Sequence, residues 1–407
     1  MPSLSDRLKS LGVKIGAQDL PASQAERPFS IENVLYGRVV PTQLGETYAV
    51  ESRYSNDYAQ GDVPIQVTHP LHGIADWIQE DRLRKITSTE IAFLDTETTG
   101  LSGGTGTYAF LIGVGRFDGD EFHLEQFFMR DPVEESGQLA ALEEFLAPCS
   151  TLVTFNGKTF DIPLLVTRYM SHGWRPPFVE HVHIDLLHLA RRLWRARLPS
   201  RTLSNLEYNI LGALRTEEDV PGWMIPQLYF DYLRTGDARP LKSVFYHNAM
   251  DVLSLAALLN HTSAILADPL NARLDHAVDI YSIARLHEDE GDLPTAIQLY
   301  QQGLQGELPE ETFLETLLRL ARLHKRQGDY DASIPLWEQA AQHKLIDAHV
   351  ELAKYFEHRL RDYDKAIAWT QRALEIIDEP GYNLYEQRYW RAELDRRHSR
   401  LHRKLYG

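Results

Sequence analysis

The sequence predicts an α/β domain built on a mixed sheet with flanking helices, followed by an all-α domain of helical repeats. Three observations support this fold class. Short apolar stretches from about residue 90 are typical of strands, strand-like and helix-like patterns alternate after them, and the last third of the chain repeats itself. A chain of 407 residues is long enough for two or three domains. We expect boundaries that divide it into residues 1–85, 86–264 and 275–400.

The amino-terminal region offers few signals. A short amphipathic stretch around Leu4, Leu8 and Leu11 precedes polar and turn-forming residues without firm periodicity, so we assign residues 1–85 no role. The start of the chain lacks a basic segment followed by an apolar one, and no run approaches the roughly 18 consecutive apolar residues that suggest a membrane span. We therefore expect a cytoplasmic protein that does not contact membranes.

The central segment begins with three successive strands. Residues 91–94 and 108–114 are apolar runs, and residues 122–128 alternate like a half-buried strand, which predicts an antiparallel meander. A helical pattern through 139–145, a strand at 152–155 and a helical pattern through 162–169 follow. Residues 184–262 should be mostly helical, with Asp185 capping a helix over 186–194. This order is typical of a mixed α/β sandwich.

Three segments of the last third align with one another. Each has small residues at matching positions and an acid at a corner: Asp292 and Asp329 follow a glycine, whereas Asp362 follows an arginine. The three acids are 37 and 33 residues apart, close to the period of about 34 residues in tetratricopeptide helix pairs. The segment resembles that repeat class, in which stacked helix pairs form a concave binding surface. We expect a protein partner there.

Charge and cysteine content exclude several classes of function. A formal net charge of −16 is unfavourable for a general polyanion binder, because affinity for nucleic acid comes mainly from phosphate neutralisation by Lys and Arg. Any nucleic acid would need a local basic surface, for which residues 191–201 offer five arginines and Trp194, although a solvated helix face explains the same pattern. The single cysteine, Cys149, excludes an internal disulfide and a cysteine-based zinc cluster.

The segment FLDTETTGL at 93–101 places Asp95 and Glu97 two residues apart at the end of an apolar strand. Because side chains alternate along a strand, both carboxylates lie on one face. Two adjacent acids at a buried strand end repel each other unless a cation offsets their charge, and hard divalent ions such as Mg²⁺ favour oxygen ligands. The pair predicts a metal site, although two solvated acids are the commoner meaning of an isolated Asp-x-Glu.

Two later segments place further acids within apolar helices. Asp161 ends the segment FNGKTFD at 155–161 and precedes a helical pattern, and Asp251 ends the segment YHNAMD at 246–251 among apolar neighbours. Neither acid lies on an evidently polar surface, and buried acids need partners. Taken singly, each could also be a helix cap or a satisfied core carboxylate.

Together, Asp95, Glu97, Asp161 and Asp251 with an adjacent His or Tyr resemble the superfamily of DNA polymerase proofreading domains and ribonuclease T-like exonucleases, the four-acid or DEDD exonucleases. The stretch from about 90 to 262 is still more similar to the bacterial YprB-type ribonuclease H-like family. The matching motifs are DTETTGL at 95–101, the glycines at 103 and 104, FNGKTFD at 155–161, IDLL at 184–187 and HNAMDVLSL at 247–255. The resemblance implies that residues 86–264 form a ribonuclease H-like domain.

The resemblance also implies that the four acids hold two divalent cations, Mg²⁺ or Mn²⁺, for phosphodiester hydrolysis. A general base is needed to position or deprotonate the attacking water. In relatives a histidine base precedes the last acid by five positions and a tyrosine base by four, whereas this chain has Tyr246 at five and His247 at four. The resemblance to the YprB-type family implies that His247 is the base, and a helix places residues four apart on one face; Tyr246 is the alternative.

Substrate contacts and function follow from the same resemblance. We expect Thr98, Leu101 and Asn156 to face the substrate, with Leu101 packed against a terminal base. The leading prediction is a metal-dependent 3′-5′ exonuclease acting on single-stranded DNA or RNA. Two alternatives stay open: a non-catalytic adaptor that uses the repeats for protein interaction, and a phosphodiesterase for short oligonucleotides, which needs little extended phosphate contact.

Overall fold

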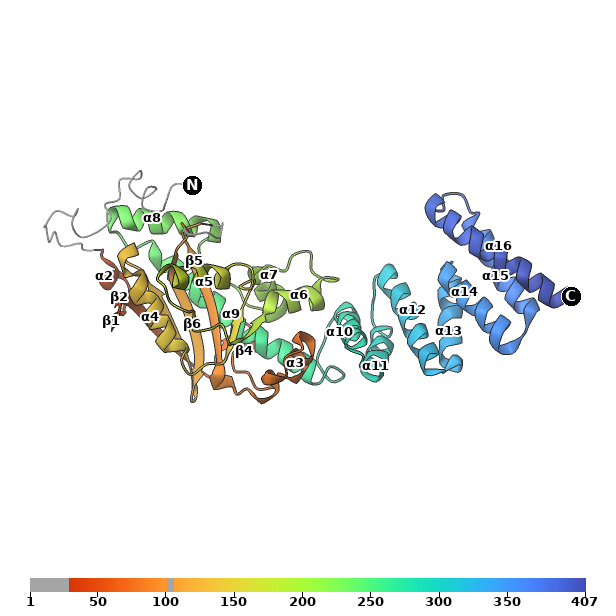
Figure 1. Ribbon diagram of the computed structural model, residues 1–407, viewed down its shortest axis with the longest axis horizontal. Helices are drawn as coiled ribbons and strands as arrows, with labels where there is room; N and C mark the ends of the chain where they lie inside the picture. Colours follow the sequence, from red (N-terminus) through yellow and green to blue (C-terminus); the bar gives the residue numbers. More distant parts are fainter. Residues whose placement is uncertain (1–28, 101–105) are drawn as a thin grey trace. The chain divides into compact units, whose positions relative to one another are not determined.

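A seven-stranded mixed sheet, with strand order β1-β2-β7-β6-β5-β8-β9, lies at the centre of the first of two units (Figure 1). The computed structural model describes residues 29–100 and 106–407, and the units are Met1–Ala272 and Arg273–Gly407. Neighbouring strands are antiparallel from β1 to β5, and β8 and β9 continue parallel to β5. The strands are β1 Arg38–Thr42, β2 Gly45–Ser55, β5 Ile91–Thr98, β6 Ala109–Asp118, β7 Glu121–Phe128, β8 Thr151–Thr154 and β9 Val182–Asp185; β3 Ala59–Gln60 and β4 Val63–Pro64 form a separate ribbon.

The predicted antiparallel meander is confirmed, because β5, β6 and β7 pair in sequence order. The strand β8 also lies where the apolar run at 152–155 predicted it. Two parts of the sheet were not predicted. The first part is β1 and β2, which are formed by residues 38–55, a stretch to which the sequence assigned no role; β2 pairs with β7. The second part is the four-residue strand β9, which directly precedes a helix that was predicted.

Helices cover both faces of this sheet (Figure 1). α4 and α5 share one apolar core with buried residues of β5 and β6, whereas α8 and α9 pack on a second core formed with β2, β6 and β7. The predicted α/β class with flanking helices is therefore confirmed. The α-helices among the described residues of this unit are α2 Ile31–Val34, α3 His72–Ile78, α4 Glu135–Leu146, α5 Asp161–Ser171, α6 Leu186–Trp194, α7 Leu203–Leu206, α8 Ile225–Thr235 and α9 Leu241–Ala267.

The 27-residue helix α9 approaches the centre of the sheet closely. A Cβ atom added to Gly113 of β6 would lie 2.1 Å from Oδ1 of Asn248, so the absence of a side chain at this position lets the helix come near. By length and composition α9 is apolar enough to cross a membrane, but 78% of its most apolar window is buried inside the protein. We interpret it as the core helix of the domain.

The second unit is all-α, which confirms the predicted helical-repeat domain. Gly291 and Gly328 end helices in the left-handed conformation, with φ of 88° and 81°, and the acid after each of them caps the next helix. Arg361 adopts φ of 55° at the third corner, and Asp362 caps α15. The helices are α10 Ala277–Glu290, α11 Leu293–Gly303, α12 Glu310–Gln327, α13 Tyr330–Gln342, α14 Ile346–Tyr355, α15 Tyr363–Ile377 and α16 Leu384–Tyr406.

Candidate active site

Asp95 and Glu97 lie on the face of β5 that α9 covers. The first four residues of β5 are buried and the rest are half-buried, so the two acids occupy the more open end of the strand. Asp95 pairs across the sheet with Gly113, and Asn248 of α9 fills the space above that glycine. Nδ2 of Asn248 donates to Oδ2 of Asp95 at 2.9 Å, while Gln126 of β7 donates to Oδ1 of Asn248 at 2.9 Å. The amide is thereby held in the orientation that donates to Asp95.

Asp161 is the first residue of α5, and it is 9% exposed. A helix start favours a carboxylate, because its backbone N–H groups are unpaired and the helix dipole is positive there. Thr96 points to the opposite face of β5 from Asp95 and Glu97, since side chains alternate along a strand. The hydroxyl of Thr96 donates to Oδ1 of Asp161. This hydrogen bond ties the start of α5 to the acidic end of β5.

Helix α9 supplies His247 and Asp251, which lie one turn apart. Nε2 of His247 is 3.7 Å from Oδ2 of Asp251 and 4.0 Å from Oε1 of Glu97. The three side chains are 13% to 17% exposed, so water still reaches them. The imidazole therefore lies between an acid of β5 and an acid of α9.

The four acids interact electrostatically. Burial raises the pKa of Asp95 well above its usual range, and repulsion from Asp251 and Asp161 raises it further. Burial and the carboxylate of Asp95, followed by those of Asp251 and Asp161, raise the pKa of Glu97 in the same way. Burial raises the pKa of Asp161 to about 6. It also raises the pKa of Asp251, although Arg215 and His247 lower it in part. The structure thus brings the four predicted acids together.

The residues at this position fit divalent cations. Asp95 receives a hydrogen bond from the neutral amide of Asn248, and Asp161 receives one from the neutral hydroxyl of Thr96. Neutral donors offset only part of a buried carboxylate's charge. Buried acids that raise one another's pKa are stabilised by a shared cation, and Mg²⁺ and Mn²⁺ favour carboxylate oxygens. The donor set therefore suits hard divalent ions.

Asp161 makes the stability of the metal-free protein depend on pH. Because folding raises its pKa from 3.8 to about 6, protonated Asp161 stabilises the fold below about pH 4, and this contribution is lost as the pH rises through about 6. In EDTA, Asp161→Asn should remove a difference in unfolding free energy on the order of 3 kcal/mol between about pH 4 and pH 7. Urea unfolding of both proteins measures this difference. The same pH dependence in variant and wild type would contradict the prediction.

Arg215 belongs to this site, and the sequence analysis missed it. It follows the π-helical turn Glu207–Leu211, a rare form often found at functional sites, and it donates to Asp251. It also donates at 2.7 Å to each oxygen of Glu207, whose side chain is 2% exposed. Ser254 of α9 donates to the same carboxylate at 2.6 Å. Arg215 thereby fastens its segment to α9 and adds one positive charge beside the acids.

Asp219 lies in the same segment, and it too was missed. Nδ1 of His247 is 2.7 Å from Oδ1 of Asp219 and 3.0 Å from Nη1 of Arg215. In a neutral imidazole, Nδ1 either donates to the carboxylate or accepts from the guanidinium. Because the contact with Asp219 is the shorter one, we assign the proton to Nδ1, which then donates to this carboxylate. Nη1 of Arg215 donates instead to Oδ2 of Asp219, at 3.5 Å. The lone pair of Nε2 consequently faces Glu97 and Asp251.

Tyr246, the alternative base, contacts a different group. Its hydroxyl accepts a hydrogen bond from the backbone N–H of Thr216 at 3.2 Å. Consecutive residues of a helix point in different directions, so Tyr246 and His247 cannot share one orientation. The geometry separates the two candidates, because His247 contacts the acids and Tyr246 contacts the segment that precedes α8.

The three residues predicted to contact substrate lie in different surroundings. Thr98 is half-buried at the end of β5, and its hydroxyl donates to the backbone carbonyl of Gly100 at 3.0 Å. Asn156 lines a cavity of about 530 Å³ and has a left-handed φ of 65°. Leu101 lies outside the residues that the structure describes. The positions of Thr98 and Asn156 are compatible with substrate contact, which stays a prediction.

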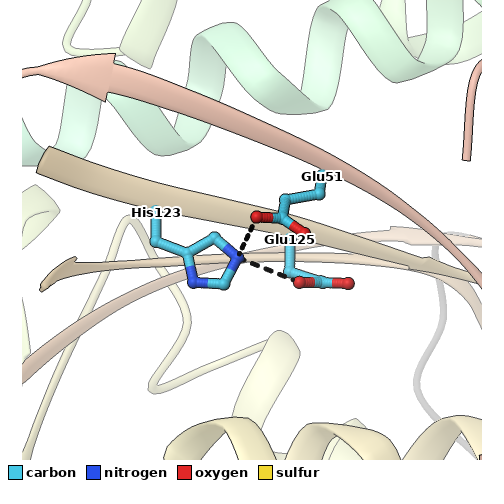
Figure 2. A group of neighbouring side chains, drawn as sticks. All are labelled: Glu51, His123 and Glu125. Atoms are coloured by element: carbon cyan, nitrogen blue, oxygen red, sulfur yellow. Dashed lines mark hydrogen bonds and ion pairs between the residues drawn. The ribbon is translucent and has the colours of Figure 1, made fainter.

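A second group of possible metal ligands consists of Glu51, His123 and Glu125. Their ligand atoms lie within 4.8 Å of one another. Figure 2 shows one ring nitrogen of His123 between the two carboxylates, at 3.0 Å from Glu125 and 3.4 Å from Glu51. Both acids already have cationic partners, since Arg38 lies 2.6 Å from Glu125 and Arg53 lies 2.7 Å from Glu51. The ion pairs account for the charge of this group without a metal.

This second group is on the other face of the sheet from Asp95 and Glu97. Glu125 and Gln126 are neighbours on β7, so their side chains point to opposite faces. Gln126 donates a hydrogen bond to Asn248 of α9, and Asn248 donates one to Asp95. His123 packs edge-on against Phe145 of α4, on the far side. The two groups are therefore separate.

Comparisons with known proteins agree with this architecture. Residues 92–263 match the RNase_H superfamily, and residues 316–351 match the tetratricopeptide repeat. A relative from Bacillus subtilis (strain 168), described as "Uncharacterized protein YprB", is 34% identical over 287 residues, which are 69% of this chain and 68% of the relative. The chain belongs to the YprB family. The predicted resemblance to the YprB-type ribonuclease H-like family is therefore confirmed.

The YprB-family chain thus contains an RNase H superfamily domain, a nuclease-type fold whose members generally use divalent cations, followed by tetratricopeptide repeats, which imply protein interaction. A solved structure, the family B DNA polymerase from the hyperthermophilic archaeon Pyrobaculum calidifontis, is 17% identical with a TM-score of 0.31. The alignment covers 56% of this chain and 29% of the polymerase chain. That likeness is too weak to support an argument about fold or activity.

Proposed function

We propose that this YprB-family chain is a metal-dependent nuclease that hydrolyses phosphodiester bonds, and more specifically a 3′-5′ exonuclease on single-stranded DNA or RNA. The observation that carries the proposal is that four buried acids influence one another's charge and that a histidine lies beside two of them. Asp95 and Glu97 each interact electrostatically with Asp161 and Asp251, and Nε2 of His247 faces Glu97 and Asp251. The RNase H superfamily match supports nuclease-type chemistry.

The chain's own residues hold the acids for this reaction. Phosphodiester hydrolysis is slow because negative charge develops on the attacking and leaving oxygens. Two divalent cations held by Asp95, Glu97, Asp161 and Asp251 would stabilise that charge and activate the attacking water. Asn248 orients Asp95, and the hydroxyl of Thr96 orients Asp161.

His247 would act as the general base. Asp219 accepts a hydrogen bond from the protonated Nδ1 of His247, which leaves the lone pair of Nε2 directed at Glu97 and Asp251. An imidazole held this way can take a proton from the attacking water, and the carboxylate behind it stabilises the imidazolium that forms. Asp219 thus acts through His247 as a positioning residue.

End-labelled single strands test the proposal. With Mg²⁺ or Mn²⁺, a 5′-labelled strand should shorten progressively into a ladder, whereas a 3′-labelled strand should release its label as a mononucleotide from the start. EDTA should stop both reactions, because the acids alone cannot offset the developing charge. Labelled products longer than a mononucleotide from the 3′-labelled strand would contradict a 3′-5′ exonucleolytic mode. The absence of products from every DNA and RNA strand would contradict a nuclease.

The second unit would bind a protein partner. The tetratricopeptide match at residues 316–351 and the stacked helix pairs favour this role, because such repeats build extended binding surfaces. The same observation favours the alternative of an adaptor without catalysis. Full cellular function of an Asp251→Ala chain would support the adaptor, and loss of function in that variant would support the nuclease.

A further inference from the structure

The first unit contains a cavity of about 530 Å³ beside the turn that leads into α5. Phe155 and Asn156 line it from the end of β8, Leu187 and Arg191 line it from α6, and Arg201 lines it from the segment after α6. Pockets of roughly 300–1,000 Å³ are typical of small-ligand sites. The described residues that line this cavity include no Asp or Glu.

Two arginines give the cavity a positive charge, and no acidic side chain among the described residues pairs with either of them. Arg191 is exposed and has no hydrogen bond or ion pair with any described residue. Arg201 donates to the backbone carbonyls of Leu198 and Pro199 at 2.7 and 3.1 Å, and its buried Nε has no partner among the described residues. In a chain with a net charge of −16, two guanidinium groups without carboxylate partners favour an anionic ligand.

The rest of the lining suits a ligand with a flat apolar part. Phe155 is half-buried, and Leu187, Pro199 and Leu203 add apolar surface. Sites for single-stranded nucleic acid combine basic groups, which contact the backbone, with aromatic side chains on which bases stack. The lining of this cavity has both components, whereas a site for inorganic phosphate alone would need no apolar surface.

The cavity is close to Asp161 along the chain. Asn156 is five residues before Asp161, and the intervening residues are coiled, since the N–H groups of Thr159 and Phe160 both bond the carbonyl of Asn156. Asp185 caps α6, as predicted, and its carboxylate also accepts the N–H groups of Asn156 and Lys158 at 2.8 and 3.1 Å. The cavity wall and the start of α5 therefore form one fixed structure.

We propose that this cavity binds one nucleotide of a single-stranded nucleic acid, upstream of the phosphodiester bond that is cleaved. Arg191 and Arg201 contact its phosphate, and Phe155 contacts its base. The inference rests on the proposed function, because it places the strand whose 3′ end lies among the acids. It also separates the arginines of residues 191–201 by role, since Arg191 and Arg201 line the cavity and Arg195 does not.

Strand binding by the full-length Asp95→Asn chain tests this inference. That chain is expected to bind a strand without degrading it, so affinity is measured apart from hydrolysis. The probes are fluorescently labelled oligo(dT) and oligo(U), titrated with Mg²⁺ present at several salt concentrations. Adding Arg191→Gln should weaken binding about tenfold and reduce the slope of log affinity against log salt by about one. Since Arg191 has no described partner, its substitution should leave the fold intact, which a thermal melt checks.

Arg195→Gln is the matched control, because Arg195 is an exposed arginine directly after α6 that lies outside the cavity. It should change affinity less than about twofold. Equal losses from Arg191→Gln and Arg195→Gln would mean that a general basic helix face binds the strand, and would overturn the cavity assignment. So would unchanged binding in Arg191→Gln and Arg201→Gln, or no binding by the parent chain.

The experiment distinguishes this inference from the proposed function. If wild-type chain degrades strands while the arginine variants bind as the parent does, the cavity assignment fails and the nuclease proposal stands. If wild-type chain degrades no strand while Arg191→Gln selectively weakens binding, the nuclease proposal fails and the cavity still binds nucleic acid. Parallel results with oligo(dT) and oligo(U) show whether the site distinguishes DNA from RNA.

Discussion

Replacing Asp95 by Asn is expected to reduce hydrolysis of a single strand by about a thousandfold or more. The substitution keeps the shape of the side chain, so Asn248 retains an acceptor. It removes a charge that the cations need, and it also relieves repulsion, because burial and the carboxylates of Asp251 and Asp161 hold the pKa of Asp95 well above its usual range. In EDTA the variant should therefore melt no lower than wild type, while the rise in Tm on adding Mn²⁺ should be lost. Initial rates and thermal melts measure both effects.

Glu51→Gln is the matched control for this substitution. It removes a carboxylate from the group of Glu51, His123 and Glu125, on the opposite face of the sheet. Hydrolysis should change less than about twofold, because that group already has arginine partners. Loss of activity in Glu51→Gln together with full activity in Asp95→Asn would transfer the metal site to the other face and refute the proposed one.

His247→Ala is expected to slow hydrolysis by about a hundredfold to ten-thousandfold, the usual contribution of a general base. Nε2 of His247 is the imidazole atom near the acids, at 3.7 Å from Asp251 and 4.0 Å from Glu97. The remaining activity should increase with pH without reaching the plateau of wild type, because hydroxide then replaces the missing base. The dependence of kcat on pH measures this change.

Two further variants check the assignment of the base. Tyr246→Phe should keep most of the activity, since the hydroxyl that it removes accepts from the backbone N–H of Thr216. Asp219→Asn should lie between wild type and His247→Ala, because it weakens the orientation of the imidazole without removing it. A larger loss in Tyr246→Phe than in His247→Ala would show that the tyrosine is the base.

The acids could be predicted because each occupies a position that a local pattern fixes. Asp95 and Glu97 follow a buried run on a strand, and alternation alone places them on one face. Asp161 begins a helix whose apolar spacing is evident, and Asp251 lies within another. Their convergence follows from the sheet order, which the superfamily resemblance implied and local periodicity could not supply.

Arg215 and Asp219 could not be predicted, because their segment has no periodicity. Asp219 follows two exposed glutamates and would pass for part of a solvated acidic loop. A general signal was available, since a histidine that acts through Nε2 needs an acceptor at Nδ1, but this requirement does not identify the residue. Only the folded chain brings Asp219 to His247.

The strands β1 and β2 were missed for a similar reason. Residues 38–55 alternate weakly, and their stability comes from pairing with β7, a strand far away in the sequence. The strand β9 spans residues 182–185, and its last two residues were assigned to the mostly helical region predicted from residue 184. Long, strongly patterned elements were predicted correctly, whereas elements that depend on distant partners were not.

The geometry of the proposed site depends on the number of residues that separate its members within helix α9. His247, Asn248 and Asp251 all lie on this single helix, most of whose other residues are in the core. Their mutual spacing is therefore set by the pitch of an α-helix, with about 1.5 Å and 100° between successive residues. Lengthening a surface connection would leave that spacing untouched. One extra residue inserted between Asn248 and Asp251 would rotate Asp251 by about 100° relative to His247 and Asn248, and would disrupt the cluster without removing a single functional group.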